Sequence, residues 1–470
     1  MLLFPLFAFS PGRALLALLA LALTIATCVY GRRYFEGAGE RRFFMYGSLG
    51  FLLSVWGTLF SAQWITFAVF MEISTAALFS LIALKEREVA LRYFVVQLVG
   101  AAFLLAGIGA AFVGHGTVFV GPVPEDALPF FILGLGVKAA LPVLHFWLPE
   151  VHGRAPAPVS ALLSGMAVKI GAFGLLQALG ADGPNFLAPV GAMMALWGVA
   201  LALAQHDMKR LLAYHTVSQL GYVIAAVGAG NPLGWCGALY HMTAHGLFKG
   251  MLFLCAGVVE KVYGTRELDR LGGAWKTLPF TCALYLVAAA AIAGLPGTIG
   301  FASKSLVKSA LSEHPMVSLA LLVANVGTVM SFCKMGWFAF GGSGKSAAQH
   351  CPGVRAMNAA LVPLAVPVLL FGFFPGWIPR FLGASEPAFF SAAKCGESVL
   401  VLFVGALFFF LLRSILKPAE KTIPDAALLF AATKCAVGKT IVLVRRLQGG
   451  NLREYILFSV LALLMLVLLL

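Results

Sequence analysis

Charged residues are scarce in this chain. Only 11% of its 470 residues are Asp, Glu, Lys or Arg, whereas 61% are hydrophobic. A typical soluble domain carries roughly 25% charged residues, so this composition excludes an ordinary soluble protein. The apolar residues are gathered in runs near the ~20 residues that a helix needs to cross a bilayer. The sequence therefore predicts an all-α, polytopic membrane protein.

Motifs for cofactors and metals are missing as well. The eight cysteines are scattered without a Cys-x-x-Cys pair, so no iron–sulfur, zinc or disulfide framework is expected. No glycine-rich loop lies between a strand and a helix, which argues against a nucleotide site. We expect no cofactor, no metal and no catalytic residue here, so any redox chemistry must occur on another chain.

About fourteen spans can be read from the apolar runs. They cover residues 14–30, 43–60, 64–84, 88–113, 128–149, 156–180, 187–205, 209–229, 233–258, 277–312, 316–341, 356–375, 397–416 and 453–470. No small-residue cleavage site follows the first run, so we expect a retained span and not a signal peptide.

Basic residues are nearly absent from every second loop. Loops after odd-numbered spans hold 24 of the 33 Lys and Arg residues, and loops on the other side hold 3. By the positive-inside rule, basic loops such as 31–42, 85–92 and 259–276 lie in the cytoplasm, and both termini lie on the far side. The net charge of +14 thus reflects topology in an inner (cytoplasmic) membrane. We expect the lipid bilayer, and no nucleic acid, as a partner.

Two lysines lie deep inside apolar runs. Lys138 and Lys169 belong to the stretch 130–176, in which two apolar segments are joined by a short polar turn. An ammonium group at this depth costs at least ~2.5–3.5 kcal/mol on insertion scales, so such a lysine is a functional candidate. Pro142 predicts a broken helix beside Lys138, an arrangement with which transporters build ion sites. The alternative is a pair of snorkelling lysines and a kink without function.

Three further titratable groups lie near this stretch. Beside a lysine, Glu72 in span 64–84 could stay ionised and exchange protons, whereas alone it would be a protonated group bonded to a neighbouring helix. His145 follows Lys138 by two helical turns, which predicts a protonatable pair on one face. His152 lies in the connecting turn and is expected to face solvent.

Span 233–258 carries a polar stripe on an otherwise apolar helix. His241, His245 and Lys249 follow one another at four-residue spacing and therefore share one face. We interpret them as a proton-conducting stripe. A metal site is disfavoured because no carboxylate or third histidine follows. The remaining alternative is two histidines that hydrogen-bond neighbouring helices.

Two more buried lysines follow. Span 277–312 is too long for one straight crossing and contains the sequence GLPG at 294–297. We therefore expect a second broken helix, with Lys304 just after the break. The next span, 316–341, carries Lys334.

The spans group into two five-helix units, 43–180 and 187–341. Each unit ends in a broken helix and then a helix with a buried lysine, and because five is odd the units cross the membrane in opposite orientations. This predicts two inverted repeats with an ion path at their interface. Residues 1–42 form an N-terminal span and a cytoplasmic loop, and 356–470 hold the C-terminal helices. Within them, 425–444 is expected to be an amphipathic helix on the cytoplasmic surface, with a fifteenth span as the alternative.

Four stretches resemble one family, in the same order. They are GVKAALPVLHFWLPEVHGRAPAPVSALLS (136–164), DMKRLLAYHTVSQLGY (207–222), YHMTAHGLFKGMLFL (240–254) and GLPGTIGFASKS (294–305). Over about 40–350 the chain is similar to the proton-translocating antiporter-like subunits of respiratory complex I, Mrp-type cation/proton antiporters and membrane-bound hydrogenases. Its RRLQGGNLREY segment is similar to formate hydrogenlyase and related hydrogenase membrane subunits. The family's glutamate helix is usually the fifth and here is the third, so about two N-terminal helices are expected to be missing.

The resemblance implies a role for each buried titratable group. Glu72 would be the carboxylate paired with Lys138, and Lys169 the bridging lysine. The central relay would comprise His241, His245 and Lys249. Lys304 or Lys334 would be the distal release group.

The resemblance also implies a function. The chain would be the subunit that translocates ions, protons or sodium, in an energy-converting redox complex of the hydrogenase/complex I type. Its partners would be other membrane subunits and a peripheral redox module, and only partner subunits would hold iron–sulfur, nickel or flavin. The alternative is a subunit of an Mrp-type Na⁺/H⁺ antiporter without redox chemistry. An inactive scaffold is disfavoured, because it has no reason to keep lysines and a glutamate within its spans.

Overall fold

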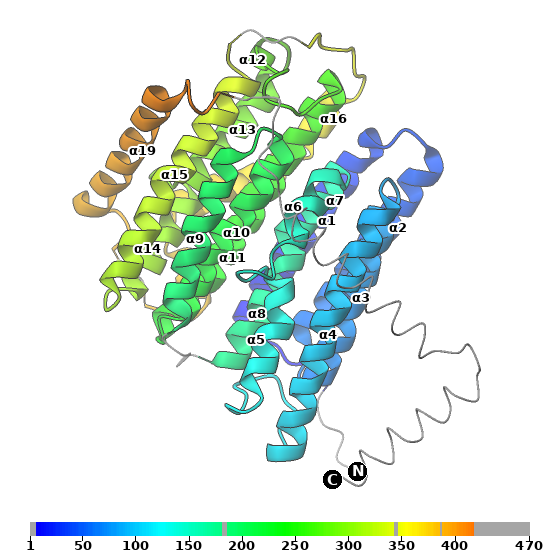
Figure 1. Ribbon diagram of the computed structural model, residues 1–470, viewed down its shortest axis with the longest axis vertical. Helices are drawn as coiled ribbons and strands as arrows, with labels where there is room; N and C mark the ends of the chain where they lie inside the picture. The colour runs from blue at the N-terminus through cyan, green and yellow to red at the C-terminus, as the bar shows by residue number, and fades with distance from the viewer. Residues whose placement is uncertain (1–5, 181–185, 343–345, 386–387, 418–470) are drawn as a thin grey trace, which may run out of the picture. The chain divides into compact units, whose positions relative to one another are not determined.

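The computed structural model describes residues 6–180, 186–342, 346–385 and 388–417, and these residues form a bundle of apolar helices (Figure 1). The helices are α1 (Pro11–Tyr34), α2 (Ala38–Phe60), α3 (Trp64–Ala83), α4 (Arg87–His115), α5 (Leu128–Lys138), α6 (Trp147–Arg154), α7 (Ala157–Leu162), the π-helical turn η1 (Leu163–Ala167), α8 (Val168–Leu179), α9 (Leu187–Ala204), α10 (Met208–Val227), α11 (Pro232–Tyr263), α12 (Ala274–Thr277), α13 (Pro279–Ala293), α14 (Ile299–Ala310), α15 (Pro315–Ala339), α16 (Val354–Ala359), α17 (Val362–Phe373), α18 (Trp377–Phe381) and α19 (Ala392–Leu412). In the described part of the chain, ten helices are long and apolar enough to cross a membrane. The predicted class, an all-α multi-pass membrane protein, is confirmed.

Each of the first thirteen predicted spans coincides with a helix or with consecutive shorter helices. The last span, 453–470, and the amphipathic segment 425–444 lie outside the described residues. The boundaries of the two five-helix repeats stay a prediction.

Both predicted helix breaks are present. The helix α5 ends at Lys138, and the chain then takes left-handed backbone angles at Ala140 (φ 55°) and Val143 (φ 68°) before α6 begins. The helix α13 ends at a left-handed Gly294 (φ 88°), and α14 begins five residues later. Lys138 therefore precedes its break and Lys304 follows its own. Helix ends leave backbone carbonyls without an intrahelical partner, so both breaks place polar backbone beside a lysine.

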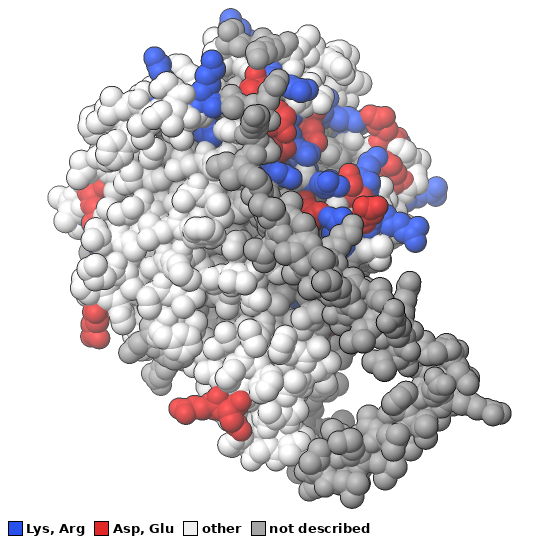
Figure 2. All heavy atoms as spheres, viewed as in Figure 1, with Lys and Arg blue, Asp and Glu red and all other residues white. Residues whose placement is uncertain are grey.

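The charged loops lie together at one end of the bundle. Lys261 pairs with Glu36 at 2.5 Å and Lys85 pairs with Glu40 at 2.9 Å, so the three basic loops named above meet. Figure 2 shows Lys and Arg gathered over the upper part of the molecule. At the other end, the Trp64 amide donates to the Val118 carbonyl (2.9 Å). The alternation of basic and non-basic loops in the sequence therefore corresponds to two ends of the structure.

Glycines bring α9 and α10 into backbone contact. A Cβ atom at Gly191 would lie 2.5 Å from the carbonyl oxygen of Gly221, and a Cβ atom at Gly221 would lie 2.5 Å from the carbonyl oxygen of Gly191. Small residues allow this close approach, which drives helix association where lipid removes the hydrophobic effect. The two helices are therefore closely packed against each other.

The helix α11 lies inside the bundle and packs against α1, α7, α10, α13, α14 and α17. An apolar 18-residue segment of α11 is entirely buried, and so is the corresponding segment of Ala157–Leu179. In α19 only 17% of such a segment is buried. The helices that carry Lys169, His241, His245 and Lys249 are thus the ones shielded from lipid. This placement suits polar groups, which avoid the lipid-facing surface.

Thiol labelling tests the topology. A cysteine at Gly37 lies at the basic end and a cysteine at Glu125 on the opposite loop, and both positions are exposed. In a background without other accessible cysteines, we expect a membrane-impermeant maleimide to label Gly37→Cys from the cytoplasmic side only and Glu125→Cys from the outside only. Labelling of both positions from the same side would overturn the topology.

Candidate functional site

Lys138 and Glu72 are neighbours without a direct contact. The Lys138 ammonium is 3% exposed and donates to the Thr75 hydroxyl at 2.7 Å. Thr75 lies one turn after Glu72 on α3, and its hydroxyl donates in turn to the Met71 carbonyl (3.2 Å). Within the described residues the two Glu72 carboxylate oxygens have no hydrogen-bond partner, although the charges of Glu72 and Lys138 act on each other. Thr75, which sequence reasoning missed, therefore stands beside the predicted pair.

Lys169 lies next to a π-helical turn. Its ammonium is fully buried and donates to the carbonyl of Ser164, which belongs to η1. The Ser164 hydroxyl lies 2.8 Å from the Thr216 hydroxyl on α10. Single π-turns occur often at functional sites because they release a carbonyl from the regular ladder. The turn gives the buried Lys169 ammonium a backbone acceptor.

The stripe on α11 is buried along its whole length. His241, His245 and Lys249 are 0% exposed, and the two imidazole rings lie nearly parallel, 9° apart in plane and 6.5 Å between centroids. Nδ1 of His241 lies 3.0 Å from the Ser303 hydroxyl on α14, and Lys249 donates to the Leu212 carbonyl on α10. The predicted common face is confirmed by this geometry.

His245 differs from His241 and Lys249, the other two residues of the stripe. Neither of its ring nitrogens has a hydrogen-bond partner within the described residues, although the charges of Lys169 and Lys249 act on it. A buried imidazole without a protein partner is expected to hydrogen-bond ordered water or to take up a proton transiently. The alternative in which both histidines hydrogen-bond neighbouring helices therefore fits His241 and not His245.

Lys304 is hydrogen-bonded to the backbone at the second helix break. Its ammonium donates to the Ile292 carbonyl and to the Asn325 side-chain oxygen, both at 2.6 Å. It also lies 5.0 Å from the centre of the Tyr222 ring, a cation–π distance. Tyr222 in turn lies 5.4 Å from the His241 ring. Lys304 is thereby joined to the α11 stripe through one aromatic ring.

Lys334 lies elsewhere. Its ammonium donates to the carbonyls of Leu203 (2.7 Å) and Gln205 (2.8 Å), and lies 3.4 Å from Nδ1 of His206. These residues form the turn between α9 and α10 at the basic end of the bundle. Burial and the Lys334 charge lower the pKa of His206, which favours the neutral ring whose Nδ1 can accept. The Lys334 ammonium is therefore held at the basic end of the bundle.

Two histidine predictions are wrong. His145 was expected on the helical face of Lys138, but α5 ends at Lys138 and the left-handed residues between them remove that shared face. His145 remains a partly exposed residue of the break. His152 was expected to face solvent, but it is 0% exposed and stacks on Phe253 at 4.6 Å. The charge of Lys249 acts on it, so His152 belongs to the surroundings of the α11 stripe.

Sequence reasoning also missed buried polar groups on α10. His215 and Gln219 are 0% exposed and lie one turn apart, and the His215 ring packs at a tilt of 41° against Phe332, 4.8 Å between ring centroids. Their four-residue spacing inside a predicted span is the same signal that identified the α11 stripe. No group of three or more His, Cys, Asp or Glu side chains in the part of the chain that the structure describes could hold a metal ion.

These features define a class: a multi-pass membrane protein with buried lysines and histidines between two broken helices. Residues 61–331 match the family described as NADH:quinone oxidoreductase/Mrp antiporter, transmembrane. The match covers more than half of the chain, so the chain belongs to this family. The family is the one that the four motifs indicated.

Individual relatives are subunits of membrane complexes. The chain is 35% identical over 333 residues to NADH-quinone oxidoreductase subunit N of Desulforudis audaxviator, covering 64% of this chain and 66% of that protein. It is 32% identical over 414 residues to hydrogenase-4 component B of Escherichia coli, covering 77% and 61%. The chain thus spans two thirds or less of the length of these relatives. Its fold is similar to a chain of the Mrp complex from Dietzia sp. DQ12-45-1b, with a TM-score of 0.80, 23% identity, and coverage of 98% of this chain and 55% of that chain.

Proposed function

We propose that this chain is the ion-translocating subunit of a multi-subunit, energy-converting redox complex of the hydrogenase/complex I type. It moves protons through a relay of lysine, glutamate and histidine near the membrane midplane. The observation that supports this most is the α11 stripe, which is fully buried and bonded through His241 to Ser303, the residue before Lys304. A packing role gives no reason to bury so many titratable groups together.

The contacts support one order for the proposed relay. Lys138 with Glu72 lies at the first helix break, and Lys169 follows on α8. We put Lys169 at the start of the α11 stripe, because its charge acts on both His245 and Lys249. The stripe then leads through His241 to Lys304. Histidine suits the middle, because an unperturbed pKa of about 6.5 lets it gain and lose a proton easily.

Lys304 fits the distal release group better than Lys334 does. The hydrogen bonds of Lys334 go to the α9–α10 turn at the basic end, which the positive-inside rule places in the cytoplasm. Lys304 lies beside the break of the α13–α14 pair, which leads away from that end. We therefore assign Lys304 to release and Lys334 with His206 to the cytoplasmic side.

The energy comes from partner subunits. Moving one charge against about 100 mV costs roughly 2.3 kcal/mol, and we propose no redox site in this chain. A peripheral module with iron–sulfur, nickel or flavin would supply that energy, passed on through other membrane subunits. The similarity to hydrogenase-4 component B over 77% of the chain supports this assembly. The second candidate, an Mrp-type antiporter subunit, is supported by the family description and by the fold.

Purification of the native complex separates the two candidates. We expect iron, nickel or flavin to co-purify with this chain, and oxidation of an electron donor to drive proton uptake into inverted membrane vesicles. The matched control is the same preparation without the donor, in which no gradient should form. A complex that lacks all three cofactors and exchanges Na⁺ for H⁺ would instead establish the Mrp-type function.

A further inference from the structure

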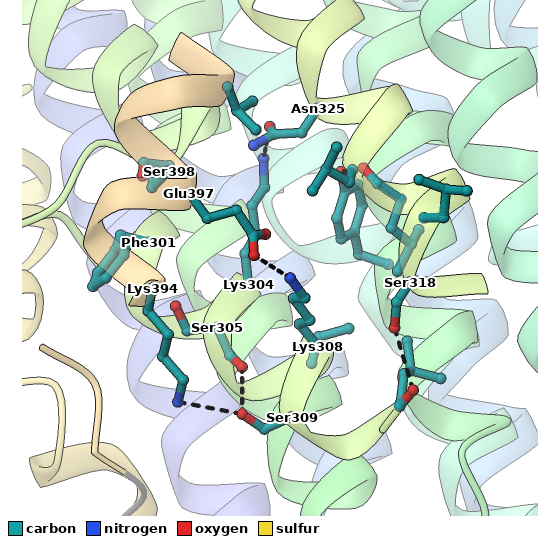
Figure 3. Close-up of a pocket in the computed structure, with 18 of the residues that line it drawn as sticks. Phe301, Lys304, Ser305, Lys308, Ser309, Ser318, Asn325, Lys394, Glu397 and Ser398 are labelled. Carbon is teal, nitrogen blue, oxygen red and sulfur yellow. Dashed lines mark hydrogen bonds and ion pairs between the residues drawn. The ribbon is translucent and has the colours of Figure 1, made fainter. Parts of the chain in front are cut away.

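A cavity of about 640 Å³ lies beside Lys304 (Figure 3). Its walls come from α14, the beginning of α15 and the beginning of α19, and its polar lining includes Lys304, Lys308, Lys394, Asn325 and Glu397. A site of this size with several polar partners has room for ordered water. The cavity therefore offers a wet region next to the proposed release lysine.

The cavity continues the relay outward. The side chains of the α11 stripe are 0% exposed, whereas Lys304 is partly exposed, and Lys308 and Glu397 are 48% and 40% exposed. The α13–α14 pair starts after the basic loop 259–276 and crosses the bundle once, so the α14–α15 turn lies at the opposite end. Accessibility thus rises from the stripe through Lys304 to the outer side.

Glu397 is the carboxylate among these cations. Its side chain reaches from α19 toward Lys308 on α14 and forms an ion pair with it (Figure 3). Lys394 is engaged elsewhere, donating to the Ala388 carbonyl (2.8 Å) and the Ser309 hydroxyl (3.4 Å). A lining of three lysines and one carboxylate disfavours entry of a metal cation. The same lining can take up a proton, because the proton neutralises the Glu397 carboxylate that is already there.

The beginning of α19 is fixed to the helix break itself. The Ser398 hydroxyl, next to Glu397 in sequence, donates to the Gly294 carbonyl at 2.6 Å. Lys304 donates to the Ile292 carbonyl two residues earlier. The same break therefore positions both Lys304 and the turn of α19 that carries Glu397.

From this arrangement we infer that Glu397 is the group that takes the proton from Lys304 and releases it outside, with Lys308 as its gate. The inference rests on the proposed function. The Lys304 ammonium loses a proton to cavity water and becomes a neutral amine, and the water chain delivers a proton to the Glu397 carboxylate. The neutral acid no longer attracts the Lys308 ammonium, so the ion pair opens. Loss of the proton to outside water restores the carboxylate and closes the pair.

Translocation by the purified complex in liposomes tests this step. Glu397→Gln keeps the shape and removes the acid, and we expect translocation to fall about 10²-fold, as for loss of a positioned proton-transfer group. The matched control is Glu313→Gln, which removes an exposed carboxylate of the α14–α15 turn that is not part of the cavity lining and should change nothing. Normal translocation by Glu397→Gln would overturn the inference.

A second measurement tests the opening of the Glu397–Lys308 ion pair without measuring transport. We expect a cysteine at Ser305, in the cavity wall, to react with an impermeant maleimide from the outside, and to react faster when Glu397→Gln or Lys308→Gln opens the ion pair. Unchanged rates in both variants would contradict the gate. Lys304→Ala distinguishes the two proposals: if it stops translocation while Glu397→Gln does not, only this inference fails, and if neither matters the proposed relay fails. If Glu397→Gln assembles poorly, Glu397→Asp, which keeps an acid, provides the comparison. We expect more translocation per assembled complex from Glu397→Asp than from Glu397→Gln, and an equal loss in both variants would contradict the role of the acid.

Discussion

Replacing Lys138 by alanine is expected to abolish ion translocation while the complex still assembles. The ammonium is buried and bonded to Thr75, and its charge acts on Glu72. Removing one partner of a buried charged pair costs about 3–5 kcal/mol when the other stays charged, so Glu72 should respond by taking up a proton and becoming neutral. The measurement is donor-driven proton uptake by reconstituted complex, together with the yield of assembled complex.

Lys138→Arg sharpens this test. Arginine keeps the positive charge beside Glu72 but does not give up its proton in proteins. We expect an assembled complex without translocation, because the relay needs a group that changes its charge. Lys85→Ala is the matched control: it removes an exposed lysine from the surface pair with Glu40, which should be worth no more than about 1 kcal/mol. Full translocation by assembled Lys138→Arg would show that the lysine does not transfer protons.

The fold could be predicted largely from the sequence. The apolar runs indicated thirteen spans that the structure describes as helices, and the two breaks followed from Pro142 and from the glycines at 294 and 297. These features are local, since a proline removes one backbone donor and a glycine permits a left-handed turn. Lysines at membrane depth were equally visible, because each interrupts an apolar run.

The partners of those lysines could not be predicted in the same way. Thr75 reaches Lys138 across 63 positions of the chain, and the Leu203 carbonyl reaches Lys334 across 131. A single sequence contains no signal for such pairs, because threonine and backbone carbonyls occur in every helix. The π-turn before Lys169 could not be predicted either, because its sequence LSGMA is that of an ordinary helix.

The errors for His145 and His152 have one physical cause. Both follow the first break, where helical periodicity no longer applies, and the left-handed residues Ala140 and Val143 turn the chain. That turn sends α6 back into the bundle, so a short polar connection becomes a buried segment against Phe253. Sequence reasoning did not reach Glu397 either, because α19 lies outside the predicted repeats and Glu397 meets Lys308 across 89 positions of the chain.

The second large effect is expected for His245→Leu, which roughly keeps the side-chain volume and removes the proton carrier. If His245 were a helix–helix hydrogen bonder, its loss would cost about 0.6 kcal/mol of packing and leave transport intact. In the structure its two ring nitrogens lack partners among the described residues, while the charges of Lys169 and Lys249 act on it. We therefore expect a complex of normal thermal stability that has lost translocation.

His350→Leu is the matched control for this variant, because it makes the same substitution at an exposed position of the loop 346–353. It should leave both thermal stability and translocation unchanged. His245→Gln adds a further check: the glutamine amide can hydrogen-bond a water molecule but does not take up and release a proton as imidazole does, so this variant should be as inactive as His245→Leu. A His245→Leu complex that pumps at the normal rate and yield would remove the α11 stripe from the proton path.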